Sequence, residues 1–244
     1  ITLPVACVDW KFSWNLCCRN GLILNLQNPS SHGMYIECIL NNAAKWNNSS
    51  PRFLIDPIPY LCIDQPAYFL NGPFDPIPYD ASYSTAIDWE AEIAVIIGRK
   101  GINIPESESM NYVFGYAAYN DTTARDVQQK RHSGQWFKGK SLDGHGPMGP
   151  WIVTAGGVDL NATRVICRVN GVQKQNASYQ QMYFKIPTII AELSKGLTLL
   201  PGDIIATGTP SGVGYSRKPP EFLKPGDLME TEITGVGIIR NRIG

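Results

Sequence analysis

The sequence predicts an α+β fold that is mainly β, with a few short helices. Apolar segments of strand length recur between turn residues, and only one segment carries strong helix signals near both of its ends. The 244 residues are 43% hydrophobic, which is enough for a full core in one large domain. We expect a short N-terminal appendage over residues 1–33 and the main domain over residues 34–244.

The N-terminal part is less regular than the rest of the chain. Residues 1–33 alternate between apolar and polar without a clear period, which predicts a few short strands. Residues 34–40 predict a strand that enters the core. Residues 41–82 are rich in Asn, Pro and aromatic residues. We expect them to form loops and short strands that lie over a functional site instead of building the core.

The pattern sharpens in the middle of the chain. Residues 87–97 predict a strand, and residues 113–119 predict a second apolar strand. Between them, residues 105–112 predict a short helix that begins with Pro105 and two acids. Strands are also expected over residues 151–155 and 163–169.

The C-terminal third combines hairpins with the best helix of the sequence. Asn170-Gly171 is a strong hairpin signal. The helix is expected over residues 186–197, where Pro187 marks the first turn and Gly196 the end. Two near-duplicate turns, at 200–203 and 223–227, each predict a strand that follows them.

Charge and hydropathy exclude several classes of partner. Lys and Arg total 21 and so do Asp and Glu, so no basic field predicts nucleic-acid binding. No apolar run approaches the ~20 residues that span a bilayer. We therefore expect neither a nucleic-acid partner nor a membrane.

The six cysteines lack any CxxC pair or zinc-finger spacing. Free, mostly buried thiols in a reducing compartment are the simplest interpretation. We expect a cytoplasmic protein. A mitochondrial location stays open, because the chain begins with Ile1 and a leader could have been removed.

Three carboxylates stand out against this background. Glu90 and Glu92 are two positions apart on a predicted strand, so their side chains share one face. Asp121 follows the next strand, and its spacing to Arg125 and Gln128 is i, i+4, i+7, typical of one helix face. Carboxylates with no His or Cys beside them favour Mg²⁺, Mn²⁺ or Ca²⁺ over zinc.

From about Ile36 to the C-terminus the chain resembles the fumarylacetoacetate hydrolase superfamily. Five motifs in the right order make this signal specific. They are WEAEIAV at 89–95, NDTTARD at 120–126, GKSLD at 139–143, PMGP at 147–150 and TGTPSGVG at 207–214, and residues 235–241 fit the closing strand. The resemblance implies a mixed β-sandwich roll, a homodimer, and Mg²⁺ or Mn²⁺ held by Glu90, Glu92 and Asp121.

The resemblance also implies substrates and roles. Family substrates are small 2-oxo acids with a second carbonyl, which react through an enolate whose charge a divalent cation stabilises. Lys140 would supply a second positive charge, and Arg125 and Gln128 would orient the metal ligands or the bound acid. Thr209, with neighbouring backbone N–H groups such as that of Gly208, would bind a substrate carboxylate. Arg125 could equally be a structural partner of Asp126 or Glu92.

One family feature is missing. Hydrolytic members carry a His and, three residues later, a Glu, whereas the corresponding stretch, residues 40–49, places Lys45 or Trp46 at the His position. Losing a general base typically costs about 10²–10⁴-fold in rate. His132 or His145 could substitute for it, or the reaction could need only proton transfer.

The headline expectation is C–C bond hydrolysis of an acylpyruvate-type substrate. The alternatives are an enolate-forming tautomerase, isomerase or decarboxylase acting on an oxaloacetate-like acid, and a catalytically silent binder of metal and keto acid.

Overall fold

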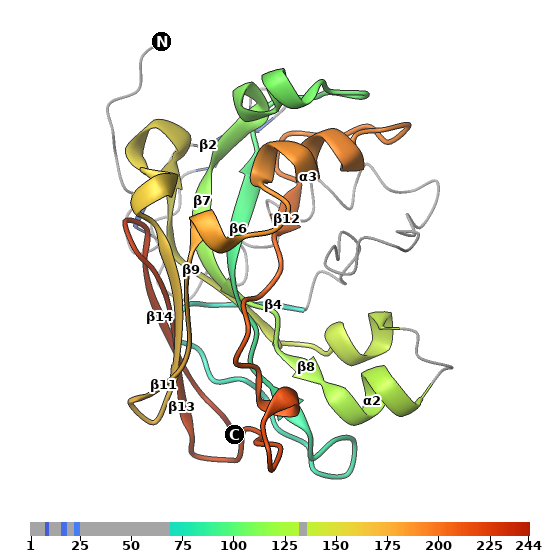
Figure 1. Ribbon diagram of the computed structural model, residues 1–244, viewed down its shortest axis with the longest axis vertical. Helices are drawn as coiled ribbons and strands as arrows, with labels where there is room; N and C mark the ends of the chain where they lie inside the picture. The colour runs from blue at the N-terminus through green and yellow to red at the C-terminus, as the bar shows by residue number, and fades with distance from the viewer. Residues whose placement is uncertain (1–7, 10–15, 19–21, 25–68, 132–135) are drawn as a thin grey trace.

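Two β-sheets pack face to face in the computed structural model, which describes residues 8–9, 16–18, 22–24, 69–131 and 136–244. The four-stranded sheet has the order β11-β10-β13-β14, and the six-stranded sheet has the order β1-β9-β7-β6-β12, with β4 also paired to β9. Figure 1 shows the smaller sheet on the left, against the larger sheet at the centre. This arrangement confirms the predicted α+β, mainly β fold.

The strands are short, as the sequence predicts. In chain order they are β1 (Val8–Asp9), β2 (Leu16–Cys18), β3 (Leu22–Leu24), β4 (Leu70–Asn71), β5 (Ile87–Asp88), β6 (Ala91–Ile97), β7 (Val113–Asn120), β8 (Thr123–Ala124), β9 (Gly146–Thr154), β10 (Arg164–Val169), β11 (Val172–Ser178), β12 (Ile204–Ala206), β13 (Leu228–Ile233) and β14 (Gly237–Arg242).

In the part of the chain that the structure describes, the helices are few and short. The α-helices are α2 (Arg125–Lys130) and α3 (Ile186–Leu193), and the 3₁₀ helices are η2 (Glu106–Tyr112), η4 (Phe137–Lys140), η5 (Ala155–Gly157), η6 (Leu160–Ala162), η7 (Tyr179–Gln181) and η8 (Gly214–Ser216). α3 packs on η2, and α2 packs on η4. No helix in the described parts of the chain is both long and apolar enough to cross a membrane.

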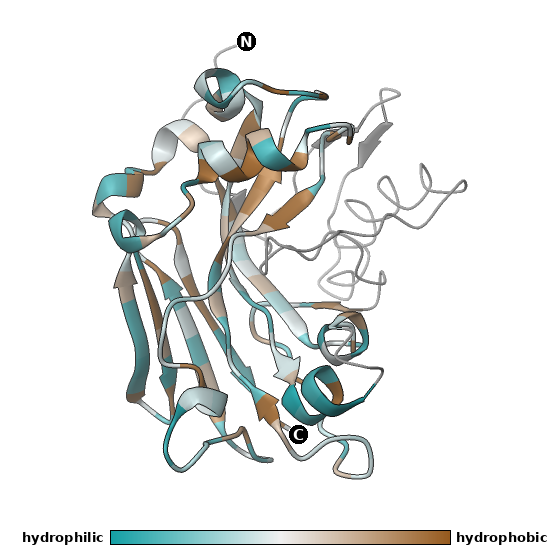
Figure 2. Ribbon diagram, turned by 45° about the vertical axis from the view of Figure 1, so that its right-hand side comes forward, coloured by the Kyte–Doolittle hydropathy of each residue, from teal (hydrophilic) through white to brown (hydrophobic). Residues whose placement is uncertain are grey.

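Strand β6 is central because both of its faces are buried. Ile93, Val95 and Ile97 enter the large core between the two sheets. Ala94 and Ile96, on the opposite face, join a smaller apolar cluster. Figure 2 shows β6 and β12 as strongly hydrophobic, whereas the strands of the four-stranded sheet change colour along their length. Glu92 shares the parity of Ala94 and Ile96, so it lies on the face turned away from the four-stranded sheet.

Several predicted boundaries need correction. The strand expected over residues 87–97 is interrupted at Trp89 and Glu90, whose backbone N–H groups donate to the side chains of Asp88 and Asn120 instead of to a ladder partner. The segment 105–112 is a 3₁₀ helix, not an α-helix.

The best predicted helix is also shorter than expected. It ends at Leu193, not at residue 197; the Ser194 carbonyl accepts from the Asn103 N–H over 2.7 Å and from the Leu197 N–H over 3.3 Å, so the chain leaves the helix in a tight turn. The hairpin at Asn170-Gly171 is confirmed, with positive φ at both residues. The strands after both duplicate turns are confirmed as β12 and β13.

Some predictions lie outside the described residues. These are the strand at 34–40, most of the loops expected over residues 41–82, and most of the appendage at 1–33.

Candidate active site

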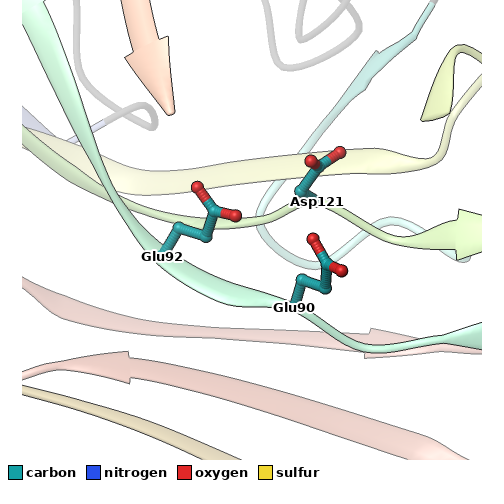
Figure 3. Close-up of side chains that lie close together, drawn as sticks. All are labelled: Glu90, Glu92 and Asp121. Atoms are coloured by element: carbon teal, nitrogen blue, oxygen red, sulfur yellow. The ribbon is translucent and has the colours of Figure 1, made fainter. Parts of the chain in front are cut away.

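Three carboxylates meet where β6 begins and β7 ends. Glu90 directly precedes β6, Glu92 is its second residue, and Asp121 directly follows β7. The Asp121 N–H donates to the Glu90 carbonyl over 2.9 Å, which fixes the two chain segments side by side. One oxygen from each carboxylate lies within 4.8 Å of the others, and Figure 3 shows the three groups gathered in one space. The predicted convergence is confirmed.

The expected helix face is wrong for Asp121. Helix α2 begins only at Arg125, because Thr123 and Ala124 form strand β8, which pairs with β5. Arg125 and Gln128 do lie on one turn of α2, and the Arg125 Nη1 donates to the Gln128 Oε1 over 3.0 Å. Asp121 therefore reaches the site from a strand end and not from the helix.

Lys140 lies inside the carboxylate cluster. Its Nζ is 2.6 Å from Asp121 Oδ2 and 2.7 Å from Glu90 Oε2, and it donates to Thr123 Oγ1 over 3.0 Å. Burial alone would lower the pKa of Lys140, but the carboxylates of Asp121 and Glu90 outweigh it and raise the pKa above its usual range. Lys140 is therefore protonated at neutral pH and is a donor, not a base.

Arg125 contacts carboxylates that differ from the expected structural partners. Its Nε donates to Asp88 Oδ2 over 2.8 Å, and its Nη2 lies 2.6 Å from Glu90 Oε1. Asp126 instead accepts from the Ser84 hydroxyl and from the Val127 N–H, and it lies 3.8 Å from Arg131 Nη2. Arg125 thus fixes Glu90 from one side while Lys140 fixes it from the other.

The glycine-rich loop after β12 closes over the same strand. The Gly208 N–H donates to Glu92 Oε2 over 2.7 Å. The Thr209 hydroxyl donates to the Ala91 carbonyl over 3.0 Å and accepts from Gln175 Nε2 over 2.7 Å. Both groups predicted to bind a substrate carboxylate therefore bind protein groups here, and their contact with substrate stays a prediction.

The charges of the cluster do not balance. Among the residues that the structure describes, six buried ionisable side chains gather here: Asp88, Glu90, Glu92, Asp121, Arg125 and Lys140. Four are acids and two are bases, so the fully ionised cluster has a surplus of two negative charges. Burial, reinforced by the carboxylates of Asp121 and Glu90, raises the pKa of Glu92 well above its usual range.

The donor set fits a divalent cation on these grounds. One such ion would neutralise the surplus, and Glu90, Glu92 and Asp121 offer the hard oxygen ligands that Mg²⁺, Mn²⁺ and Ca²⁺ prefer. A buried carboxylate whose charged form is disfavoured gains most from a cation beside it.

The histidines contribute little to the described site. Burial lowers the pKa of His145 to about 4, despite a hydrogen bond between its ring and the backbone of Pro78. A base of such low proton affinity is poorly matched to neutral pH, so His145 does not fit the role of a substitute base. His132 and the stretch 40–49 lie outside the described residues.

Three site residues escaped the sequence reasoning. Asp88 holds Arg125, Gln175 holds Thr209, and the Asn120 side chain accepts from the Glu90 N–H over 2.9 Å. Asp88 carried a signal, because it stands two positions before Glu90 as Glu92 stands two after it. Gln175 carried none, since its partners are 34 and more residues away in the sequence.

Comparison with known proteins gives a family match over most of the chain. Residues 36–244 match the family described as fumarylacetoacetate (FAA) hydrolase C-terminal.

Curated relatives cover a similar region. Oxaloacetate tautomerase fahd2, mitochondrial, of Xenopus laevis is 47% identical over 173 residues, which are 70% of this chain and 54% of that protein. Oxaloacetate tautomerase YisK of Bacillus subtilis is 45% identical over 176 residues, 72% of this chain and 58% of that protein. The chain thus spans just over half the length of these relatives.

Solved structures agree with the fold. A fumarylacetoacetate hydrolase from Exiguobacterium antarcticum has a TM-score of 0.71 at 43% identity, over 73% of this chain and 64% of that one. A probable 2-hydroxyhepta-2,4-diene-1,7-dioate isomerase from Mycobacterium abscessus has a TM-score of 0.67 at 35% identity, over 73% of this chain and 68% of that one.

Proposed function

The chain belongs to the fumarylacetoacetate hydrolase family, and on this premise we propose that it is a divalent-metal-dependent tautomerase of a small 2-oxo dicarboxylic acid of the oxaloacetate type. The observation that carries the proposal is the buried cluster of Glu90, Glu92 and Asp121 with Lys140 inside it. The names of the Xenopus and Bacillus relatives, both oxaloacetate tautomerases, support the reaction.

Keto–enol tautomerisation moves one proton and leaves every other atom in place. In the enol-to-keto direction the O–H proton on the C2 oxygen leaves to solvent water, the electron pair of the C2=C3 double bond takes up a proton from solvent at C3, and the C2–O bond becomes a carbonyl; negative charge passes through the C2 oxygen. The charge that develops on that oxygen sets the barrier, so donors and cations aimed at it accelerate the reaction. A divalent cation held by Glu90, Glu92 and Asp121 would supply positive charge beside the oxygens of the substrate.

The protein's own groups have distinct tasks in this proposal. Lys140 donates its three N–H groups to Glu90, Asp121 and Thr123, so its positive charge, and not a hydrogen bond, stabilises the negative charge on the C2 oxygen. Arg125 holds Glu90 Oε1 and so leaves Glu90 Oε2 on the side of Lys140. Gln128 fixes the guanidinium of Arg125 through its own amide oxygen.

Tautomerisation is favoured over C–C hydrolysis because it consumes no water. Hydrolysis needs an activated water molecule, and the stretch 40–49 lacks the His and Glu that hydrolytic relatives carry. His145, with its low pKa, does not replace them. Hydrolysis of acylpyruvates and decarboxylation of oxaloacetate remain the competing reactions, and both release pyruvate.

Two assays on one reaction mixture separate these functions. Oxaloacetate enol is mixed with protein loaded with Mg²⁺ or Mn²⁺, and the ultraviolet absorbance of the enol is followed beside a coupled assay for pyruvate. Metal without protein gives the background. Loss of enol without pyruvate supports the tautomerase, whereas protein-dependent pyruvate would replace it with decarboxylation. An acylpyruvate panel in the same pyruvate assay tests hydrolysis.

Assembly and location belong to the proposal as well. We propose a homodimer, which light scattering after gel filtration tests. The name of the Xenopus relative carries the word mitochondrial, which supports a mitochondrial location over the cytoplasm, and cell fractionation distinguishes the two.

A further inference from the structure

We propose that Asp88 is a positioning residue that holds the glycine-rich loop and Arg125 in register with the three carboxylates. This inference rests on the proposed function, because it concerns the same site. The hydrogen-bond partners of Asp88 are Arg125 and the backbone of Trp89, Gly214 and Tyr215, so it acts on the three carboxylates through Arg125 and through the loop backbone.

The Asp88 carboxylate is fully buried, and each of its two oxygens accepts two hydrogen bonds. Its Oδ1 accepts from the N–H groups of Trp89 and Gly214 over 2.8 and 2.7 Å. Its Oδ2 accepts from the Tyr215 N–H over 2.9 Å and from Arg125 Nε over 2.8 Å. Four donors from three separate segments converge on a side chain with 0% exposure, which only an ionised carboxylate satisfies without leaving a donor unpaired.

The loop is tied at both ends to acids on one short stretch of chain. At its start the Gly208 N–H donates to Glu92, and at its far end the Gly214 and Tyr215 N–H groups donate to Asp88. Glu90 stands between these two acids in the sequence and is held by Arg125. The loop, residues 208–215, is therefore held at its start by Glu92 and at its far end by Asp88.

Gly214 shows how closely the loop backbone approaches the Asp88 carboxylate. A Cβ atom at this position would lie 2.8 Å from Asp88 Oδ1 and would also meet the Glu221 carbonyl. Real Cβ atoms essentially never approach so closely, so the backbone reaches Asp88 only because residue 214 lacks a side chain.

Asp88 also acts on the site through Arg125. The guanidinium donates Nε to Asp88 and places Nη2 2.6 Å from Glu90 Oε1. Without the charge of Asp88, the guanidinium keeps only Glu90 as a carboxylate partner and can turn toward it. Glu90 would then lose the geometry that places Oε2 on the side of Lys140 and the other two carboxylates. Such outer partners of metal ligands typically contribute a factor of about 10–100 in metal affinity or activity.

The test compares Asp88→Asn with Glu232→Gln. The control removes an ion pair of the same 2.8 Å length, with Arg168, from the four-stranded sheet. Four quantities are measured on the whole chain: the Kd for Mn²⁺ by calorimetry, the Kd of oxalate for the Mn²⁺-loaded protein, and KM and kcat for oxaloacetate enol. Oxalate serves as an unreactive probe with two adjacent oxygen groups.

A positioning role predicts a specific pattern. The Kd values and KM of Asp88→Asn rise by roughly 10–100-fold, while those of Glu232→Gln stay at the wild-type values. A residue that only stabilised the fold would lower kcat in proportion to the folded fraction and leave Kd and KM unchanged. Wild-type Kd and KM in folded Asp88→Asn would overturn the inference.

Failure of the inference is distinguishable from failure of the proposed function. If wild-type protein shows no tautomerase activity but Asp88→Asn still weakens Mn²⁺ and oxalate binding, the positioning role stands and the reaction is wrong.

If Asp88→Asn does not fold, Tyr215→Pro replaces it, with Tyr215→Ala as its control. Proline in the first turn of η8 removes the N–H that Asp88 accepts and is sterically tolerated there. The inference predicts weaker oxalate binding for the proline variant than for the alanine variant, and equal binding would contradict it.

Discussion

The backbone N–H of Gly208 donates to Glu92 Oε2 over 2.7 Å, which joins residues 116 positions apart in the sequence. This bond links the loop proposed to bind substrate to a carboxylate proposed to bind metal. A displacement of the loop would therefore displace a proposed metal ligand. Substrate binding at the loop and metal binding at Glu92 should affect each other's affinity.

Gln175 tests this link, because its buried amide holds the loop to the start of β6. Its Oε1 accepts from the Ala91 N–H over 3.1 Å, and its Nε2 donates to Thr209 Oγ1 and to the Pro210 carbonyl over 2.7 Å. Gln175→Leu leaves the buried Ala91 N–H without its partner, which costs about 1–3 kcal/mol, and it removes the bonds that hold Thr209 and Pro210. We expect KM for oxaloacetate to rise, as steady-state kinetics would show. Gln173→Leu, on the same strand but exposed, should leave KM unchanged.

Lys140 offers a second prediction. Lys140→Met removes a buried charge from between Glu90 and Asp121. Breaking such a pair destabilises a protein by about 3–5 kcal/mol, which urea unfolding of the metal-free protein measures. With saturating metal we expect kcat to fall by about 10²–10³-fold, since the positive charge beside the substrate oxygen is gone. Lys138→Met changes an exposed residue of the same 3₁₀ helix, and an equal effect there would refute a specific role for Lys140.

Gly139 sets the distance between η4 and α2. A Cβ atom there would lie 2.8 Å from the Gln128 backbone nitrogen. Gly139→Ala must therefore push η4, which carries Lys140, away from the helix, at a cost of about 1–3 kcal/mol. We expect a lower thermal midpoint together with a lower kcat. Gly156→Ala has no atom within 4 Å of the new Cβ and should change neither quantity.

His145 predicts how stability depends on pH. Burial holds its folded-state pKa at about 4, below the ordinary value of 6.5. Between these two pH values the unfolded chain binds a proton that the folded protein does not, so stability falls as pH drops from 6.5 toward 4. This residue accounts for a loss of up to about 3 kcal/mol. Unfolding curves of wild type and His145→Gln, measured across this range, should converge as the pH falls. Parallel curves would contradict the assignment.

The parts of the site that the sequence predicts are those set by local geometry. Glu90 and Glu92 are two residues apart on one chain segment, and Asp121 follows the strand that pairs with β6. Period-two alternation and hairpin order are enough to bring these three together. The contact of Lys140 with Glu90 spans 50 positions and follows from no local rule.

The errors have physical causes of the same kind. Asp121 was placed on a helix because its spacing to Arg125 fits one. Thr123 and Ala124 instead pair with β5, so the helix begins only at Arg125. The cause is a partner strand at residues 87–88, well before this segment in the sequence. Asp88 was overlooked because its donors come from Arg125 and from a loop about 126 positions away. In both cases the structure depends on tertiary contacts between residues far apart in the chain, and a single sequence does not reveal such contacts.

The measurement that most directly tests the account combines metal binding with turnover in wild type and Glu92→Gln. Calorimetry with Mn²⁺ should give one tight site per wild-type chain. At a metal concentration of 100 Kd, binding should raise the free energy of unfolding by about 2.7 kcal/mol, and the thermal midpoint should rise with it. The same protein should convert oxaloacetate enol to the keto form only when metal is present. Glu92→Gln should lose tight binding and turnover together. Enol conversion at the wild-type rate by metal-free protein, or by Glu92→Gln, would contradict the central claim that the three carboxylates hold the cation on which the reaction depends.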